Sequence, residues 1–194
     1  MPRIDIAELQ VLLEKHRPQF EAYRDLLIKW NKTYNLTSIT RPDEIWEKHF
    51  LDSITPLPLL PEQGSILDVG AGAGFPGIPL KIVRPALSVT LLEATGKKCT
   101  FCEAVIRELD LKDINVARAR VEDIGNGLDK FDMVISRATF STEDLVKHLT
   151  RYLKDKKSRI IAMKSGDEGY SGKAEKFETT LPHSGAKRTI FVIS

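Results

Sequence analysis

The sequence predicts an α/β fold in which a mostly parallel sheet ends in an antiparallel hairpin and carries a helical extension at the N-terminus. From residue 65 onward, short apolar runs alternate with amphipathic stretches, as in parallel sheets whose strands are joined by covering helices. From about residue 5 to residue 50, apolar side chains recur at helical spacing. The chain is therefore expected to divide into an N-terminal extension over residues 1–60, packed on the core, and a core domain over residues 61–194.

The extension is expected to contain three helices. Apolar side chains recur at helical spacing over residues 9–13 and again over residues 20–30, and Pro18 suits the first turn of the second helix. Thr40 or Asp43 is expected to cap the third helix. That helix includes Trp46, His49 and Phe50.

The core domain is expected to contribute parallel strands followed by a hairpin. The parallel strands are predicted over residues 66–69, 89–93, 114–117, 133–136 and 160–163. Helices are predicted over residues 78–83, 97–109 and 142–153. Near the end of the chain, residues 177–180 and 188–193 flank a turn-forming Pro-His-Ser-Gly segment, which predicts the hairpin.

Composition excludes some classes of protein. No apolar run approaches the ~20 residues that a membrane-spanning helix needs. The first residues lack the basic-then-apolar order of a signal peptide, so a cytoplasmic location without membrane contact is expected. The net charge of +2 leaves a nucleic-acid partner open, because a near-neutral total can include a local basic face.

The two cysteines do not indicate a metal site. Cys99 and Cys102 have no second pair of Cys or His to complete a zinc site, so no metal is expected. A redox pair is disfavoured, because a thioredoxin-type motif opens its helix after a strand whereas these residues lie within an amphipathic run.

The loop after the first predicted strand has the composition of a ligand-binding turn. Gly70, Gly72 and Gly74 allow backbone conformations forbidden to other residues and let a ligand approach the main chain. Residues 72–77 also satisfy the G-x-G-x-x-G pattern of dinucleotide sites, where a helix N-terminus meets a pyrophosphate. Asp68 suits a cationic ligand better, such as the methionyl ammonium of S-adenosylmethionine, although a carboxylate here also caps turns.

The ends of the next two strands supply partners for an adenosine. Glu93 lies a little over twenty residues past the glycines, where a carboxylate accepts hydrogen bonds from ribose hydroxyls in both cofactor classes. After the third strand, Val121 could cover the adenine and Glu122 could accept from its exocyclic amine. The alternative for Val121 and Glu122 is an ordinary solvated helix start.

Two basic residues are expected at the same edge of the sheet. Arg137 ends the fourth strand, where a guanidinium can hold a carboxylate or phosphate or stack on a base; a simple ion pair with Asp132 or Glu122 is the alternative. Lys164 follows the fifth strand and is expected to face the cleft, with a solvated surface position as the alternative.

Four ordered blocks are far more specific than the glycine turn alone. They are Tyr34–Thr37, His49–Ser53, Leu67–Leu80 and Val134–Ala138. In these blocks the chain resembles the ribosomal RNA small subunit methyltransferase G family, also called glucose-inhibited division protein B, over nearly its whole length. The resemblance implies a Rossmann-like class I methyltransferase sheet, with residues 61–194 binding S-adenosylmethionine.

The resemblance also implies a reaction, methylation of N7 of one guanine in 16S ribosomal RNA, within a small-subunit assembly intermediate. By motif position it places five residues at the donor: Gly70, Phe75, Val121, Glu122 and Arg137. It also places Arg137 next to the target base. Glu93 stands where relatives often have aspartate, but it can still hold a ribose.

Guanine N7 has a free lone pair at neutral pH, so no general base is expected and the catalytic role of Arg137 is to position donor and base. His49 and Asp52, three residues apart on one helix face, are candidates to guide the nucleotide, and so is Asn35. For His49 and Asp52, joining the N-terminal helices to the sheet is an equal alternative. Basic residues expected near the cleft are Arg41, Lys97, Lys98, Arg118, Arg120, Arg137 and Lys164, the last also a candidate to bind substrate.

Two other functions stay open from the sequence. A nicotinamide-dependent oxidoreductase is disfavoured by the terminal hairpin, because the second half of a dinucleotide domain is all parallel, and no separate substrate domain remains. A non-catalytic RNA-binding assembly factor with the same fold is separated from an enzyme only by measuring methyl transfer.

Overall fold

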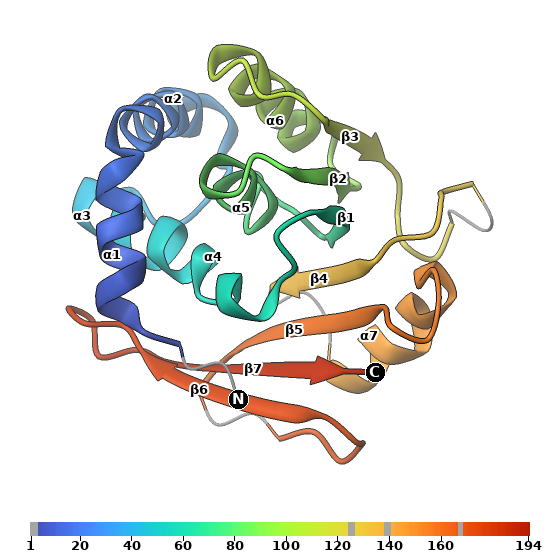
Figure 1. Cartoon of the computed structure of the whole chain (residues 1–194). Helices are drawn as coiled ribbons and strands as arrows, with labels where there is room; N and C mark the ends of the chain where they lie inside the picture. The colour runs from blue at the N-terminus through green and yellow to red at the C-terminus, as the bar shows by residue number, and fades with distance from the viewer. Residues whose placement is uncertain (1–3, 124–126, 138–140, 167–168) are drawn as a thin grey trace.

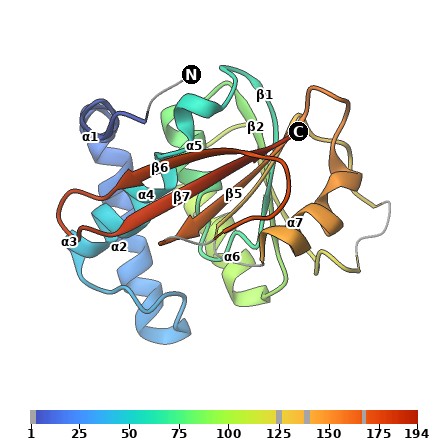
Figure 2. The ribbon, with the colours of Figure 1, turned by 90° about the horizontal axis from the view of Figure 1, so that it is seen from below.

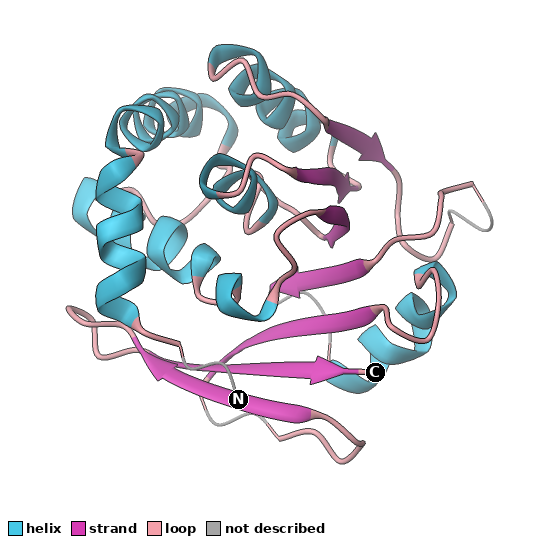
Figure 3. Ribbon diagram, in the orientation of Figure 1, coloured by secondary structure: helices cyan, strands magenta, loops and turns pink. Residues whose placement is uncertain are grey.

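A seven-stranded sheet forms the centre of the computed structural model (Figure 1; Figure 3). The structure describes residues 4–123, 127–137, 141–166 and 169–194. The first three residues of the chain, and Ala138 at the end of the fourth sequence block, lie outside the described residues.

The strand order is β3-β2-β1-β4-β5-β7-β6. The parallel strands are β1 (Gly64–Val69), β2 (Leu87–Glu93), β3 (Ile114–Arg118), β4 (Met133–Arg137) and β5 (Arg159–Ser165). The antiparallel hairpin consists of β6 (Glu175–Thr180) and β7 (Lys187–Ile193), with β7 paired to β5. This arrangement confirms the fold class predicted from the sequence.

The helices precede the sheet or connect its strands. They are α1 (Ile6–Lys15), α2 (Arg17–Tyr34), α3 (Pro42–Ile45), α4 (Asp52–Ile54), α5 (Gly77–Val83), α6 (Gly96–Glu108) and α7 (Thr142–Leu149). A π-helical turn, η1 (Trp46–Leu51), joins α3 to α4, so residues 42–54 form one continuous helical run. Two short 3₁₀ turns are η2 (Leu57–Leu59) and η3 (Thr150–Tyr152).

The expected cap of the third helix is wrong. Arg41 occupies the N-cap position without a side-chain cap, and Pro42 follows as the first helical residue. Pro42 has no N–H, so one of the N–H groups that a helix start leaves unpaired is absent, and its fixed φ already suits the helix. The Asp43 carboxylate instead accepts from the Arg41 guanidinium at 2.7 Å.

Alternating side chains along the strands supply two apolar layers. On one face, Ile66 and Ile135 pack in a cluster with side chains of α1, α2, α5 and α6. On the other face, Leu67 and Val134 pack against Leu145 of α7. Figure 2 shows this division, with α1 and α2 on one side of the strands and α7 on the other. No helix in the described ranges is long and apolar enough to cross a membrane.

Candidate functional site

Two adjoining cavities lie at the carboxyl ends of the parallel strands. The first, the glycine-loop cavity, has a volume of about 150 Å³ and is lined by Leu36, Thr37, His49, Gly70, Ala71, Gly72, Ala73, Phe75 and Arg137. The second, the arginine cavity, has a volume of about 230 Å³ and is lined by Ile39, Lys48, His49, Asp52, Arg137, Met163, Lys164, Ser165 and Arg188. Because His49 and Arg137 line both, they form the wall between them.

The glycines of the loop have different roles. Gly72 has a φ of +60°, and a Cβ added there would meet only the Gly70 carbonyl oxygen at 3.9 Å, so its backbone faces open space. Gly74 has a φ of +93°, but a Cβ there would lie 2.4 Å from Ile78 Cδ1 and 2.7 Å from the Tyr23 hydroxyl. Tight packing therefore requires Gly74, whereas Gly72 is the position that a ligand can approach.

Tyr23 supports the loop from α2, a role that the sequence did not reveal. Its side chain is fully buried, and its hydroxyl donates to the Ala73 carbonyl oxygen. The Tyr23 ring stacks on Phe75 with centroids 5.4 Å apart, and the His49 ring stacks on Phe75 at 4.3 Å. The signal in the sequence is that the Tyr23 hydroxyl is a polar group on the apolar face of α2. Phe75 is thus fixed by side chains of the N-terminal helices.

Replacing Tyr23 by phenylalanine is expected to lower the free energy of unfolding by about 1 to 3 kcal/mol, because the buried Ala73 carbonyl loses its side-chain donor. Urea unfolding measures the change. Tyr152→Phe is the matched control, since the Val121 carbonyl that its hydroxyl contacts at 3.5 Å also accepts from Arg151 at 2.7 Å. Equal destabilisation by the two variants would contradict the role given to Tyr23.

Two carboxylates hold the glycine loop by its backbone. Asp68 is fully buried, and its Oδ2 accepts from the Gly77 N–H at 2.7 Å. Burial raises the pKa of Asp68 to about 7, although the Gly77 hydrogen bond and Arg137 lower it. Glu93 accepts from the Gly72 N–H at 2.9 Å and from the Thr95 N–H at 2.8 Å. Asp68 thus makes the turn-capping contact that the sequence left as an alternative.

The second carboxylate oxygen of Asp68 lacks a hydrogen-bond donor in the described part of the chain. Asp68 Oδ1 is buried and has no hydrogen-bond partner among the described residues. An unpaired buried oxygen is costly, and an ionised one more so. A cationic ligand group beside the glycine loop would satisfy it.

The cysteines also belong to the support of this loop. Cys99 Sγ donates to the Glu93 carbonyl oxygen at 3.3 Å, and Cys102 Sγ donates to that of Gly72 at 3.5 Å. Burial raises the pKa of both thiols, which keeps them protonated and unreactive. In the described ranges no group of three or more His, Cys, Asp or Glu side chains is placed to hold a metal ion.

Six predicted ligand residues do not line the two cavities: Asn35, Asp68, Gly74, Glu93, Val121 and Glu122. Val121 is buried in the apolar layer under α7, and Glu122 is exposed. Asn35 is exposed at the left-handed end of α2, with a φ of +48°. Its neighbour Thr37 reaches the site instead, because its hydroxyl lies 2.9 Å from His49 Nε2.

Arg137 contacts the N-terminal helical run. Its Nη1 lies 3.2 Å from Asp52 Oδ2 and donates to the Lys48 carbonyl oxygen at 3.2 Å, while its Nη2 lies 3.3 Å from His49 Nδ1. The Arg137 guanidinium also lies 5.1 Å from the centroid of the Phe75 ring. The ion pair with Asp132 considered from the sequence is wrong, since Asp132 lies at the other end of β4.

Asp52 and His49 join this helical run to the sheet. Asp52 is 3% exposed, and its Oδ1 accepts from Arg188 Nε at 2.8 Å while its Oδ2 contacts Arg137. Burial, with a smaller effect of Arg137, lowers the pKa of His49 to about 3, so its imidazole is neutral near pH 7. Direct contact of either residue with a nucleotide stays a prediction.

Two more basic residues complete the arginine cavity. Lys164 is 4% exposed, so the solvated surface position considered for it is wrong. Arg188 was not predicted as a site residue; the pairing of Arg188 with Ser165 across β7 and β5 brings it to the cavity. The predicted basic residue Arg41 is exposed and pairs with Asp43.

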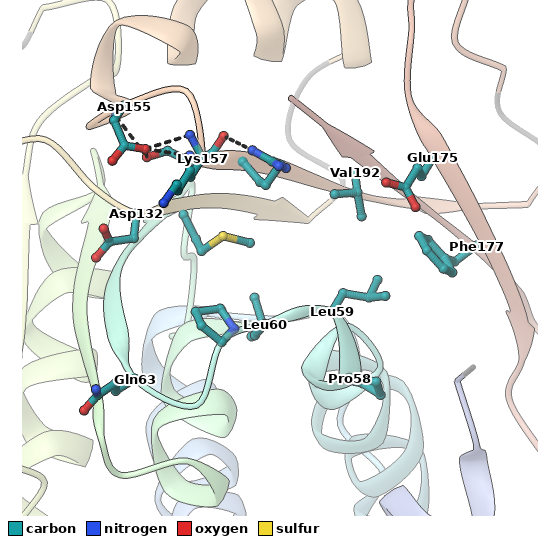
Figure 4. Close-up of a pocket in the computed structure, with 14 residues that line it drawn as sticks. Pro58, Leu59, Leu60, Gln63, Asp132, Asp155, Lys157, Glu175, Phe177 and Val192 are labelled. Carbon is teal, nitrogen blue, oxygen red and sulfur yellow. Dashed lines mark hydrogen bonds between the residues drawn. The ribbon is translucent and has the colours of Figure 1, made fainter. Parts of the chain in front are cut away.

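A larger cavity lies at the opposite edge of the sheet, away from the glycine loop. It has a volume of about 650 Å³ and opens between residues 58–61 and strands β4 to β7 (Figure 4). Two of its acidic side chains are held by hydrogen bonds: Asp132 accepts from the Ser65 hydroxyl at 2.8 Å, and Asp155 accepts from the Lys157 N–H at 2.7 Å. It contains none of the residues predicted to bind donor or RNA.

Comparison with known proteins identifies the family. Residues 16–190 match the family model described as rRNA small subunit methyltransferase G. A protein named ribosomal RNA small subunit methyltransferase G from Lachnoclostridium phytofermentans is 40% identical over 93% of this chain and 82% of its own length. The protein of that name from Lactobacillus acidophilus is 38% identical over 94% of this chain and 84% of its own length. The solved precorrin-6y C5,15-methyltransferase from Geobacter metallireducens shares the fold, with a TM-score of 0.55 and 15% identity over 72% of this chain and 84% of that one. The chain belongs to the rRNA small subunit methyltransferase G family.

Proposed function

We infer that the chain transfers a methyl group from S-adenosylmethionine to N7 of a guanine in small-subunit ribosomal RNA. The observation that carries this inference is the glycine-loop cavity with Arg137 in its wall, together with the unpaired oxygen of Asp68 in the strand before that loop, in a member of this methyltransferase family. Residues 61–194 form the donor-binding domain. Residues 1–60 form an extension that supplies His49 and Asp52 to the wall of the site.

The residues around the glycine-loop cavity fit the donor. S-adenosylmethionine, when bound, supplies a methyl group activated by a sulfonium. The unpaired Asp68 Oδ1 supports a contact with the donor's ammonium, and the open backbone at Gly72 supports a close approach of the donor to the loop. Glu93 reaches the same loop and has the remaining lone pairs to accept from the ribose hydroxyls. The same resemblance supports adenine contacts from Val121 and Glu122.

The side chains of the site contribute to catalysis by positioning the reacting groups. Guanine N7 needs no deprotonation, which agrees with a site whose histidine, His49, is neutral and already contacts Thr37 and Arg137. Fixing the reacting atoms in line and excluding water can contribute ~7 to 11 kcal/mol. Positive charge moves from the sulfonium to the base during transfer, and the Asp52 carboxylate beside Arg137 limits repulsion of that charge.

The substrate is proposed to be 16S rRNA in a small-subunit assembly intermediate in the cytoplasm. A base enters an enclosed pocket only when it is unstacked, and this costs least where the RNA is not yet fully folded. Lys164 and Asn35, with His49 and Asp52, are the proposed contacts to this RNA.

Binding of S-adenosylhomocysteine is expected to strengthen as the pH rises through about 7, because the ligand's ammonium binds the ionised form of Asp68. The raised pKa means that Asp68 itself stabilises the fold most at low pH, and this contribution is lost as the pH rises through about 7. Below that pH, the association constant is expected to fall by up to about tenfold per unit. His49 does not titrate in this range, since its pKa is about 3.

Calorimetric titration between pH 5.5 and about 8.5 measures this dependence. Asp68→Asn is the matched variant, and it is expected to bind more weakly at high pH and to lose the dependence. The same slope in Asp68→Asn as in the natural chain would exclude Asp68 as the titrating group.

Two experiments test the proposed function. Titration with S-adenosylhomocysteine and, separately, with NAD distinguishes a methyltransferase from an oxidoreductase, and binding of NAD alone would overturn the inference. Incubation with tritiated S-adenosylmethionine and under-methylated small subunits distinguishes an enzyme from a scaffold. Donor binding without label transfer would favour the non-catalytic assembly factor.

A further inference from the structure

We propose that the arginine cavity binds a backbone phosphate of the RNA beside the target guanine. This inference rests on the proposed function and deepens it. Among the described side chains that line the cavity, four are basic, Lys48, Arg137, Lys164 and Arg188, and one is acidic, Asp52. Such a lining favours an anion, and phosphate is the anion that RNA presents.

Asp52 orients the two arginines of the cavity. Each of its oxygens contacts one guanidinium, Oδ1 with Arg188 at 2.8 Å and Oδ2 with Arg137 at 3.2 Å. The side chains of Arg137 and Arg188 are only 15% and 16% exposed, so both guanidinium groups are held in a partly desolvated place. Charge-assisted hydrogen bonds are stronger there than at the open surface.

The Nη2 group of Arg188 is available as a hydrogen-bond donor to a ligand. Its Nε binds Asp52 and its Nη1 donates to the Lys187 carbonyl oxygen at 3.0 Å. Within the described residues no acceptor contacts its Nη2. Two N–H groups on a fixed guanidinium are the arrangement that phosphate oxygens accept from.

The position of the cavity matches the shape of a nucleotide. His49 and Arg137 separate it from the glycine-loop cavity, where the donor is proposed to bind. A nucleotide carries its base and its phosphate on different carbons of the ribose, so adjoining cavities can take the base and the phosphate of one nucleotide. Figures 1 and 2 show β7, which carries Arg188, running beside β5. The terminal hairpin therefore supplies a substrate contact as well as closing the sheet.

Steady-state transfer of tritiated methyl groups to under-methylated small subunits tests this inference through Arg188→Gln. The KM for subunits is expected to rise about ten- to a hundredfold, since a hydrogen bond between charged groups is lost, while kcat changes little. The dependence of log kcat/KM on log salt is expected to become shallower by roughly one, as for one lost phosphate contact. The affinity for S-adenosylhomocysteine is expected to stay unchanged.

Two further variants control the experiment. Arg159→Gln removes an arginine at the other end of β5, whose Nη1 donates only to backbone oxygens at 3.1 Å in the described structure, and it should leave KM and the salt slope unchanged. Arg188→Lys keeps the charge and should recover part of the loss in KM. Thermal unfolding of each variant shows whether the fold is retained.

The possible results separate the inference from the proposed function. An unchanged KM and salt slope in a folded Arg188→Gln protein, with the natural chain active, would overturn the phosphate site and leave the function standing. A fall in S-adenosylhomocysteine affinity at an unchanged salt slope would also overturn it, by assigning the cavity to the donor. No transfer by the natural chain would overturn the function itself, and the phosphate site with it.

Discussion

Arg137→Ala is expected to lower kcat/KM for methyl transfer by at least about a hundredfold, because a small displacement of the reacting groups already costs that much. Arg137 lines both cavities, as His49 does, and it also contacts Phe75 and His49. Its loss would leave neither the base nor the donor fixed against the wall of the site. We expect the effect mainly in kcat, since positioning matters most in the transition state.

The fold is expected to survive this substitution. Asp52, the buried partner of Arg137, keeps its 2.8 Å contact with Arg188 and is not left as an unpaired buried charge. Label transfer with saturating donor measures kcat, and circular dichroism and thermal unfolding report on the fold. Arg137→Lys is the matched variant, which keeps the charge but loses the planar guanidinium, and an intermediate rate is expected. Unchanged turnover in Arg137→Ala would refute the catalytic role.

Gly74→Ala is expected to lower the free energy of unfolding by about 2 to 5 kcal/mol and to abolish binding of S-adenosylhomocysteine. About 1 to 2 kcal/mol comes from the positive φ of +93°, and roughly 1 to 3 kcal/mol from crowding. The added Cβ would stand 2.4 Å from Ile78 and 2.7 Å from the Tyr23 hydroxyl that holds the loop. Relief of either contact displaces the loop from α2 or from α5.

Gly185→Ala separates the two contributions. Gly185 has a φ of +65°, and a Cβ there would meet nothing within 4 Å, so only the backbone cost applies. Gly72→Ala has the same backbone cost but faces the cavity, and it should weaken donor binding more than it destabilises the fold. Urea unfolding and calorimetry measure both quantities. If Gly74→Ala were no more destabilising than Gly185→Ala, the packing role of Gly74 would be wrong.

Local patterns predicted the elements of the sheet well. Strand β1, predicted over residues 66–69, extends over Gly64–Val69, and the 142–153 helix is split into α7 and a 3₁₀ turn at Thr150–Tyr152. The spacing of apolar residues indicates which face of each helix or strand is buried, and burial of that face stabilises the element. The edge of the sheet that holds the site follows from the parallel strands, so Glu93 and Arg137 could be placed from sequence.

Contacts between distant segments could not be predicted in this way. The pairing of Arg188 with Asp52 requires both the register of β7 on β5 and the path of residues 42–54 across the strand ends. The hydrogen bond from Tyr23 to Ala73 likewise depends on how α2 packs on the loop. Asn35 shows the converse, since its block resembles the family although the side chain at the cavity is Thr37, two residues later. Sequence patterns give local conformation, whereas these contacts come from tertiary packing.

The central claim is methyl transfer to a guanine N7 in small-subunit rRNA. It is tested most directly by incubating the natural chain with tritiated S-adenosylmethionine and under-methylated small subunits, and then mapping the labelled nucleotide. We predict label in 16S rRNA at one guanine, released as N7-methylguanine on mild acid hydrolysis, and none with Arg137→Ala. Label on another atom, on ribosomal protein or nowhere in the subunit would contradict the claim.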